Sequence, residues 1–128
     1  MLNMAGVGNR VEIIIGVASD MLPEVAKKVP HADLIFEDHG KQCYTPDLKL
    51  MESLGMVVPG TWVVADNVVH PGAPGFLEHL VPENGYASTE LLEAAFEYEE
   101  PWREGDVGAR EDAISLSKFV GLPKGQEV

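Results

Sequence analysis

Apolar and polar positions along the chain alternate between short β-branched runs and polar segments rich in glycine and proline. The β-branched runs predict three strands, at residues 11–17, 32–38 and 61–66. Two later runs, residues 91–98 and 113–120, predict a further pair of strands. Because the polar connection between these two is short, we expect them to pair antiparallel, as a hairpin at the edge of the sheet.

Helix signals fill the spaces between the first three strands. Asp20 is placed to cap a helix running to about Lys28, and Thr45 is placed to cap a second helix that Gly55 ends. A short helix around Phe76 follows the third strand. The order of elements predicts an α/β fold with parallel strands flanked by helices and a C-terminal antiparallel hairpin.

Composition and charge narrow the class of partner. The 128 residues suit one domain, and nine Lys and Arg against 21 Asp and Glu give a net charge of −12. This acidity argues against nucleic acid or an anionic membrane and favours a small ligand that is cationic or bridged by a metal. With Cys43 as the single cysteine and no run near the ~20 apolar residues of a membrane span, we expect a soluble cytoplasmic protein.

Polar oxygen ligands follow two of the predicted strands. Asp66 and Asn67 come directly after the third run, and Glu37 and Asp38 close the second. In open α/β sheets ligands bind beyond the carboxyl ends of parallel strands, so these side chains predict an oxygen-rich pocket for a hard divalent cation. The alternative is that such acids cap the next helix or meet solvent.

Several segments resemble the catechol O-methyltransferase family. The similarity runs in order from Met1 to about Gly121. It is carried by the segments Asp38-His39-Gly40-Lys41, Ala65-Asp66-Asn67-Val68, Pro71-Gly72-Ala73-Pro74-Gly75-Phe76-Leu77 and Phe96-Glu97-Tyr98. The resemblance implies a partial Rossmann-like methyltransferase sheet, S-adenosylmethionine as methyl donor, and magnesium that chelates a catechol.

The family's site residues can be carried over position by position. By resemblance, the magnesium ligands are Asp38, Asp66 and Asn67, and Lys41 is the general base, whose pKa a neighbouring dication would lower. The resemblance also implies two groups of ligand contacts. The substrate contacts are Lys41, Asn67, Pro71 and Glu97, and the cofactor contacts are Ala18, Ser19, Asp38 and His39.

The chain departs from the family pattern in three places. Ala18 stands where the family has a serine that touches adenine, and Gly40 replaces a tryptophan that closes over the metal. The family's glycine-rich cofactor loop lies upstream of the matched part. We therefore expect residues 1–121 to be the C-terminal part of such a domain, truncated at its N-terminus, with 122–128 as a frayed tail. The strand ending at Asp38 would become an apolar edge, which lowers stability.

Two other readings stay open. The chain can be a catalytically inactive remnant that binds a metal or a partner, or a phosphoacceptor domain that gathers acids around magnesium. The phosphoacceptor reading requires a lysine at the end of a later strand, whereas Lys118 lies inside an apolar run. The expected partner is a small catechol, with neither nucleic acid nor membrane, and a homo-oligomer forms if the exposed sheet edge is paired.

Overall fold

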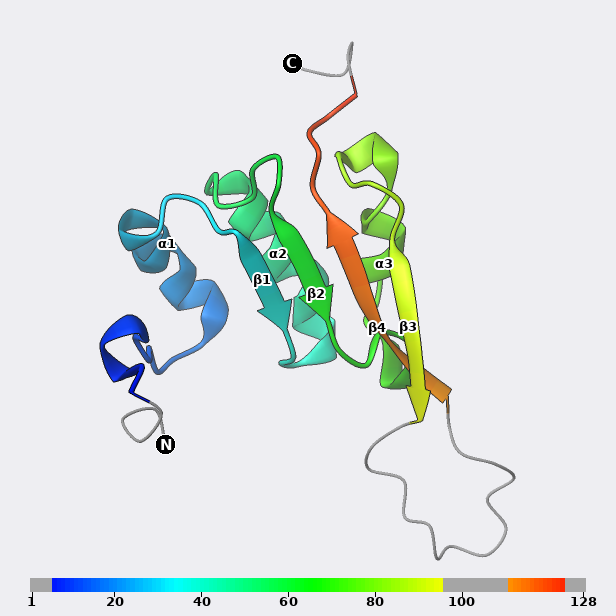
Figure 1. The fold of residues 1–128 in the computed structure, drawn as a ribbon, viewed down its shortest axis with the longest axis horizontal. Helices are drawn as coiled ribbons and strands as arrows, with labels where there is room; N and C mark the ends of the chain where they lie inside the picture. The colour runs from blue at the N-terminus through cyan, green and yellow to red at the C-terminus, as the bar shows by residue number, and fades with distance from the viewer. Residues whose placement is uncertain (1–5, 96–110, 124–128) are drawn as a thin grey trace, which may run out of the picture.

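The computed structural model describes residues 6–95 and 111–123. Its strands form one four-stranded sheet in the order β1-β2-β4-β3 (Figure 1). The parallel pair is β1 with β2, and β4 runs antiparallel to both β2 and β3. The bounds are β1 Leu34–Glu37, β2 Trp62–Ala65, β3 Glu90–Ala95 and β4 Glu111–Lys118. The predicted α/β class and the C-terminal hairpin are therefore confirmed.

The α-helices are α1 (Ala18–Lys28), α2 (Tyr44–Ser53) and α3 (Phe76–His79). Short helical turns of other types occur at Gly8–Arg10, Lys41–Cys43, Val68–Gly72 and Pro82–Asn84. None of the helices in the described part of the chain is long and apolar enough to cross a membrane.

Two of the predicted helix starts are wrong in detail. Asp20 lies within the first turn of α1, where a carboxylate favours the positive end of the helix, and Val17 occupies the cap position. The second helix begins one residue before Thr45, because the turn Lys41–Cys43 leads directly into it. The Thr45 hydroxyl donates instead to the Pro74 carbonyl, 2.8 Å away, and so ties α2 to the loop after β2.

Helices α2 and α3 cover one face of the sheet, and the core lies between them and the strands (Figure 1). Ile35 of β1 and Val63 of β2 point into this core, where Leu48, Phe76 and Tyr44 are fully buried. Alternation along the strands produces this pattern, since successive side chains of a strand point to opposite faces. Leu48 and Met51 give α2 the apolar face that packs in this core.

The opposite face of the sheet exposes large apolar side chains. Leu34 and Phe36 of the edge strand β1 are 59% and 56% exposed, and Trp62 and Leu92 are also exposed. Lys118 lies over the Trp62 ring, 5.6 Å from its centroid, and screens part of it. The expectation that the strand ending at Asp38 forms an apolar edge is confirmed.

The predicted strand at residues 11–17 is wrong. The sheet of the described residues contains no strand from this segment, and Ile13 and Ile15 are 73% and 91% exposed. An apolar β-branched run becomes a strand only when a neighbour supplies partners for its N–H and C=O groups. Here the run leads instead into α1, at the side of the sheet near β1 (Figure 1).

Candidate functional site

The register of the parallel strands brings the two predicted acidic ligands side by side. Glu37 pairs with Ala65 at the ends of β1 and β2, so the next residues, Asp38 and Asp66, leave the sheet at adjacent positions. The Asp66 N–H donates to the Glu37 carbonyl at 3.1 Å, which continues the pairing beyond the strands. Neighbouring strands lie roughly 4.8 Å apart, so two carboxylates at this edge can share one cation.

Lys41 is held between the two strand ends. Its Nζ lies 3.4 Å from Asp38 Oδ1 and donates to the Tyr44 hydroxyl at 2.6 Å. That hydroxyl donates in turn to the Asp66 carbonyl at 2.9 Å. Tyr44 thus connects the loop after β1 with the loop after β2, and it links the Lys41 amine, which lies next to Asp38, to the backbone of Asp66.

The electrostatics around Lys41 favour its charged form. Burial alone lowers the pKa of Lys41, but the hydrogen bond to Tyr44 and the carboxylate of Asp38 together raise it above its ordinary value. Burial raises the pKa of Tyr44, so its hydroxyl keeps the proton that it donates to Asp66. Lys41 is therefore protonated at neutral pH and forms an ion pair with Asp38.

Replacing Tyr44 with phenylalanine tests this connection. We expect Tyr44→Phe to lower the free energy of unfolding by about 1–3 kcal/mol, because the Asp66 carbonyl loses its donor and Lys41 loses an acceptor. The pKa of Lys41 should also fall, as followed by NMR of its Nζ. Tyr86→Phe is the matched control, since that hydroxyl donates to Glu52 and should leave the Lys41 pKa unchanged. A Lys41 pKa that responds equally to both variants would contradict the assignment.

Asn67 is fixed by contacts to a distant strand. Its backbone is left-handed, with φ 55°, a conformation that asparagine tolerates better than most residues, and its N–H donates to Asp66 Oδ1 at 2.8 Å. Its side-chain Nδ2 donates to Asp112 Oδ2 at 2.6 Å. Burial raises the pKa of Asp112, but hydrogen bonds from His70, Asn67 and Ala113 bring it below its ordinary value, so the residue is ionised.

The predicted magnesium ligands fit a hard cation by their chemistry. Asp38 and Asp66 contribute carboxylates and Asn67 contributes an amide oxygen, which are the ligand types that Mg²⁺ prefers. The side-chain oxygen of Asn67 meets no hydrogen-bond donor among the described residues, whereas the side-chain nitrogen is bonded to Asp112. Within residues 6–95 and 111–123, no three His, Cys, Asp or Glu side chains gather in a way that could hold a metal ion. Two of the three predicted ligands, Asp38 and Asp66, belong to these residue types.

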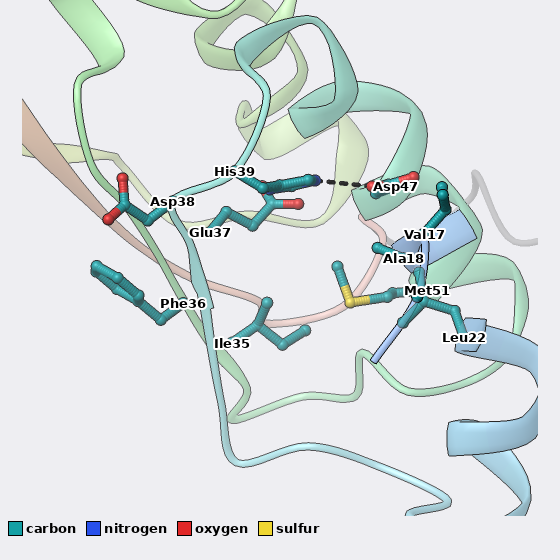
Figure 2. Close-up of a pocket in the computed structure, with 11 residues that line it drawn as sticks. Val17, Ala18, Leu22, Ile35, Phe36, Glu37, Asp38, His39, Asp47 and Met51 are labelled. Atoms are coloured by element: carbon teal, nitrogen blue, oxygen red, sulfur yellow. Dashed lines mark hydrogen bonds and ion pairs between the residues drawn. The ribbon is translucent and has the colours of Figure 1, made fainter. Parts of the chain in front are cut away.

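A cavity of about 590 Å³ lies between β1, α2 and the start of α1 (Figure 2). Three of the predicted cofactor contacts line it, namely Ala18, Asp38 and His39, whereas Ser19 is not among its lining residues. His39 bonds Asp47 at 2.7 Å and stacks on Tyr44, with ring centroids 5.2 Å apart. Three of the four cofactor contacts predicted from the sequence therefore line the same cavity.

Glu37 is the unexpected member of this cavity. Its side chain is 3% exposed, and neither carboxylate oxygen has a hydrogen-bond partner among the described residues. Figure 2 shows it on the same side of β1 as Ile35, while Phe36 and Asp38 point to the other side. Burial, followed by the charges of Asp47 and Glu52, raises the pKa of Glu37 to about 8.

Two predicted substrate contacts lie elsewhere. Pro71 lines a separate hollow of about 320 Å³ with Val68 and Ala73, on the loop after β2. Glu97 lies outside the described residues, as do residues 124–128 of the predicted tail. The structure thus places Asp38, Lys41 and Asp66 at the ends of β1 and β2, with Ala18 and His39 on the cavity beside β1, and it leaves Pro71 in a separate hollow.

Sequence reasoning missed two residues that organise the site, Tyr44 and Asp112. Tyr44 lies three positions after Lys41 and at the start of a helix, where such pairs face one another, so its spacing was a usable signal. Asp112 bonds to Asn67, 45 residues earlier in the chain, and no local pattern indicates this partner.

Known proteins with similar sequences are named as O-methyltransferases. The chain is 42% identical to catechol O-methyltransferase of Bos taurus over 82 residues, 62% of this chain and 30% of that protein. It is 34% identical to catechol O-methyltransferase B of Danio rerio over 119 residues, 91% of this chain and 41% of that protein. A transmembrane O-methyltransferase of Homo sapiens is 35% identical over 82 residues, 62% of this chain and 28% of that protein. The chain thus spans less than half the length of each of these relatives. No protein-family model matches it.

The fold also matches that of a solved structure. The chain aligns with a putative O-methyltransferase from Klebsiella pneumoniae with a TM-score of 0.67 and 23% identity, covering 94% of this chain and 54% of that one. At this identity the match establishes the fold alone. The sheet of β1 to β4 with its helices is therefore part of an O-methyltransferase fold, as the sequence predicted.

Proposed function

The chain is related by sequence to catechol O-methyltransferases, and from this premise we propose that it carries the metal- and base-bearing part of an O-methyltransferase site. The proposed reaction moves a methyl group from S-adenosylmethionine to a hydroxyl of a magnesium-chelated catechol. The observation that carries the proposal is the placement of Lys41 between the adjacent strand ends that bear Asp38 and Asp66.

Each residue has a defined task in this proposal. Asp38, Asp66 and Asn67 would hold Mg²⁺ through oxygen atoms. When bound, the cation supplies positive charge that lowers the pKa of a coordinated catechol hydroxyl and of a nearby amine. Lys41 would accept the proton of that hydroxyl in its neutral form, after the lowered pKa has let the ammonium release its own proton to solvent. Its amine is already within reach of the site, fixed by the Tyr44 hydroxyl, so little reorganisation is needed.

Other residues would bind and orient S-adenosylmethionine and the substrate. Ala18 and His39 line the cavity that would receive part of S-adenosylmethionine, and the bond to Asp47 holds the His39 ring in place. Asp38 stands where this cavity and the proposed cation site meet. Pro71 and Glu97 are proposed substrate contacts by family resemblance, as is Ser19 for the cofactor.

The test is a calorimetric titration of the chain with S-adenosylmethionine, with and without magnesium, followed by a methyl-transfer assay on catechol. We expect magnesium-dependent turnover that Asp66→Ala abolishes, because the cation loses a carboxylate at the centre of the site. Asp33→Ala is the matched control, since Asp33 is an exposed acid just before β1. A folded chain that binds neither ligand would overturn the proposal.

A second function is favoured by the segment 11–17. This run leads to Ala18 on the cofactor side, yet it lies outside the sheet and is exposed. The alternative is a catalytically inactive domain that binds a metal or a partner but no S-adenosylmethionine. Magnesium binding without S-adenosylmethionine binding, in the same titration, would select it.

A further inference from the structure

Asp112 lies on β4, far along the chain from the proposed ligands, and is buried with 5% of its surface exposed. Its two carboxylate oxygens serve different partners. Oδ2 accepts from Asn67 Nδ2 at 2.6 Å. Oδ1 accepts from three backbone N–H groups, those of Val69 at 3.2 Å, His70 at 2.9 Å and Ala113 at 2.8 Å. The residue therefore holds both the Asn67 side chain and the loop that follows it.

The Asp112 side chain accepts hydrogen bonds at both oxygens, and the atom of Asn67 that faces it is the amide nitrogen. The amide oxygen then lies on the other side of the same carbon, directed away from Asp112. A cation binds the oxygen of an amide and is repelled by its N–H₂ group. The acceptor character of Asp112 thus decides whether Asn67 presents a ligand or a donor to the site.

We infer that Asp112 is a positioning residue for cation binding, which sets the Asn67 amide so that its oxygen faces the site. The inference rests on the proposed function, because it assigns Asn67 oxygen to the cation. It adds a residue that touches neither the proposed cation nor the substrate. Outer partners of this kind typically change metal affinity 10–100-fold when replaced.

Asp112→Asn separates positioning from folding. Asparagine has one oxygen, and keeping it on the three backbone N–H groups preserves the loop. Its N–H₂ group then faces Asn67, whose amide reverses so that its oxygen accepts and its own N–H₂ turns to the cation site. We expect the variant to fold and to bind Mn²⁺, followed by electron paramagnetic resonance of the free ion, about 10–100-fold more weakly than wild type.

A double variant distinguishes a loss of Asn67 positioning from a general loss of structure. In Asp112→Asn with Asn67→Asp the net charge of the pair is unchanged. The new carboxylate at position 67 accepts from the N–H₂ group at position 112 and offers its second oxygen to the cation. We expect Mn²⁺ affinity to return to within about threefold of wild type, against the 10–100-fold loss of the single variant. A double variant no better than Asp112→Asn would overturn the inference.

A measurement on wild type covers the case in which Asp112→Asn does not fold. NMR of the cation-free chain should show a slowly exchanging Asn67 side-chain amide proton, bonded to Asp112. A freely exchanging amide, in a chain that binds Mn²⁺ when the ion is added, would overturn this inference and leave the proposed function standing. A protected amide in a chain that binds no Mn²⁺ would overturn the cation site of the proposed function, and with it the role given to Asp112.

Discussion

Replacing Glu37 with leucine is expected to raise the free energy of unfolding by about 3 kcal/mol at pH 7. The wild-type carboxyl is buried without a hydrogen-bond partner among the described residues, and its pKa rises to about 8. Because the pKa of Glu37 is higher in the folded state than in the unfolded state, its protonation at low pH stabilises the folded state. This advantage is lost as pH rises from the ordinary value near 4.5 through about 8. Leucine removes the ionisable group and adds apolar contact beside Ile35.

The pH dependence of the free energy of unfolding tests the role of Glu37 more specifically than the value at pH 7 does. Urea unfolding of the wild type should show stability falling steadily between about pH 5 and pH 8, and Glu37→Gln should flatten that slope, because its amide does not ionise. Glu83→Gln, at an exposed position in a turn, is the control and should keep the wild-type slope. An unchanged slope in Glu37→Gln would show that Glu37 is solvated or paired in solution.

Phe76→Ala is expected to lower the free energy of unfolding by about 3–5 kcal/mol. Phe76 is fully buried and meets the Tyr44 ring edge-on, with centroids 5.3 Å apart. Removing it opens a cavity beside the tyrosine that holds Lys41. Since whole domains are stable by about 5–15 kcal/mol, the variant should be close to unfolding at room temperature.

The chain offers a matched control for this loss. Phe36→Ala makes the same chemical change on the open face of β1, where the side chain is 56% exposed, so it should cost less than about 1 kcal/mol. Both variants are compared by thermal and urea unfolding. Equal losses would mean that the open face is covered in solution, for example by another copy of the chain.

The local apolar pattern was sufficient to predict β1 and β2, the two strands that precede the proposed ligands. Ile35 and Val63 lie in short apolar runs, pair with each other in parallel register and are buried in the core, and both strands formed as predicted. The run at 11–17 has the same local pattern and is not a strand, because pairing depends on a neighbour that the pattern does not encode. The strand-end rule likewise predicted that Asp38 and Asp66 lie at one edge of the sheet, because the carboxyl ends of parallel strands meet there, and the observed register makes them adjacent.

Contacts between distant segments explain what the sequence did not reveal. Asp112 reaches Asn67 across 45 positions, and the Tyr44 hydroxyl reaches Asp66 across 22. Glu37 was read as one of two strand-end acids, but alternation along β1 turns it into the core while Asp38 points away (Figure 2). Its burial depends on the packing of α2, which residue spacing alone does not give.

The position of β4 between β2 and β3 has a consequence for the order of assembly. The segment that closes the Asn67 loop leaves the ribosome more than 40 residues after the loop itself. Until it arrives, β2 has one neighbour, β1, and the loop lacks the carboxylate that accepts from Val69 and His70. Contacts of such sequence separation slow folding. A nascent chain released before β4 would therefore have its acidic strand ends in place but no ordered ligand loop. The ability to bind a cation would therefore arise only once β4 has been made.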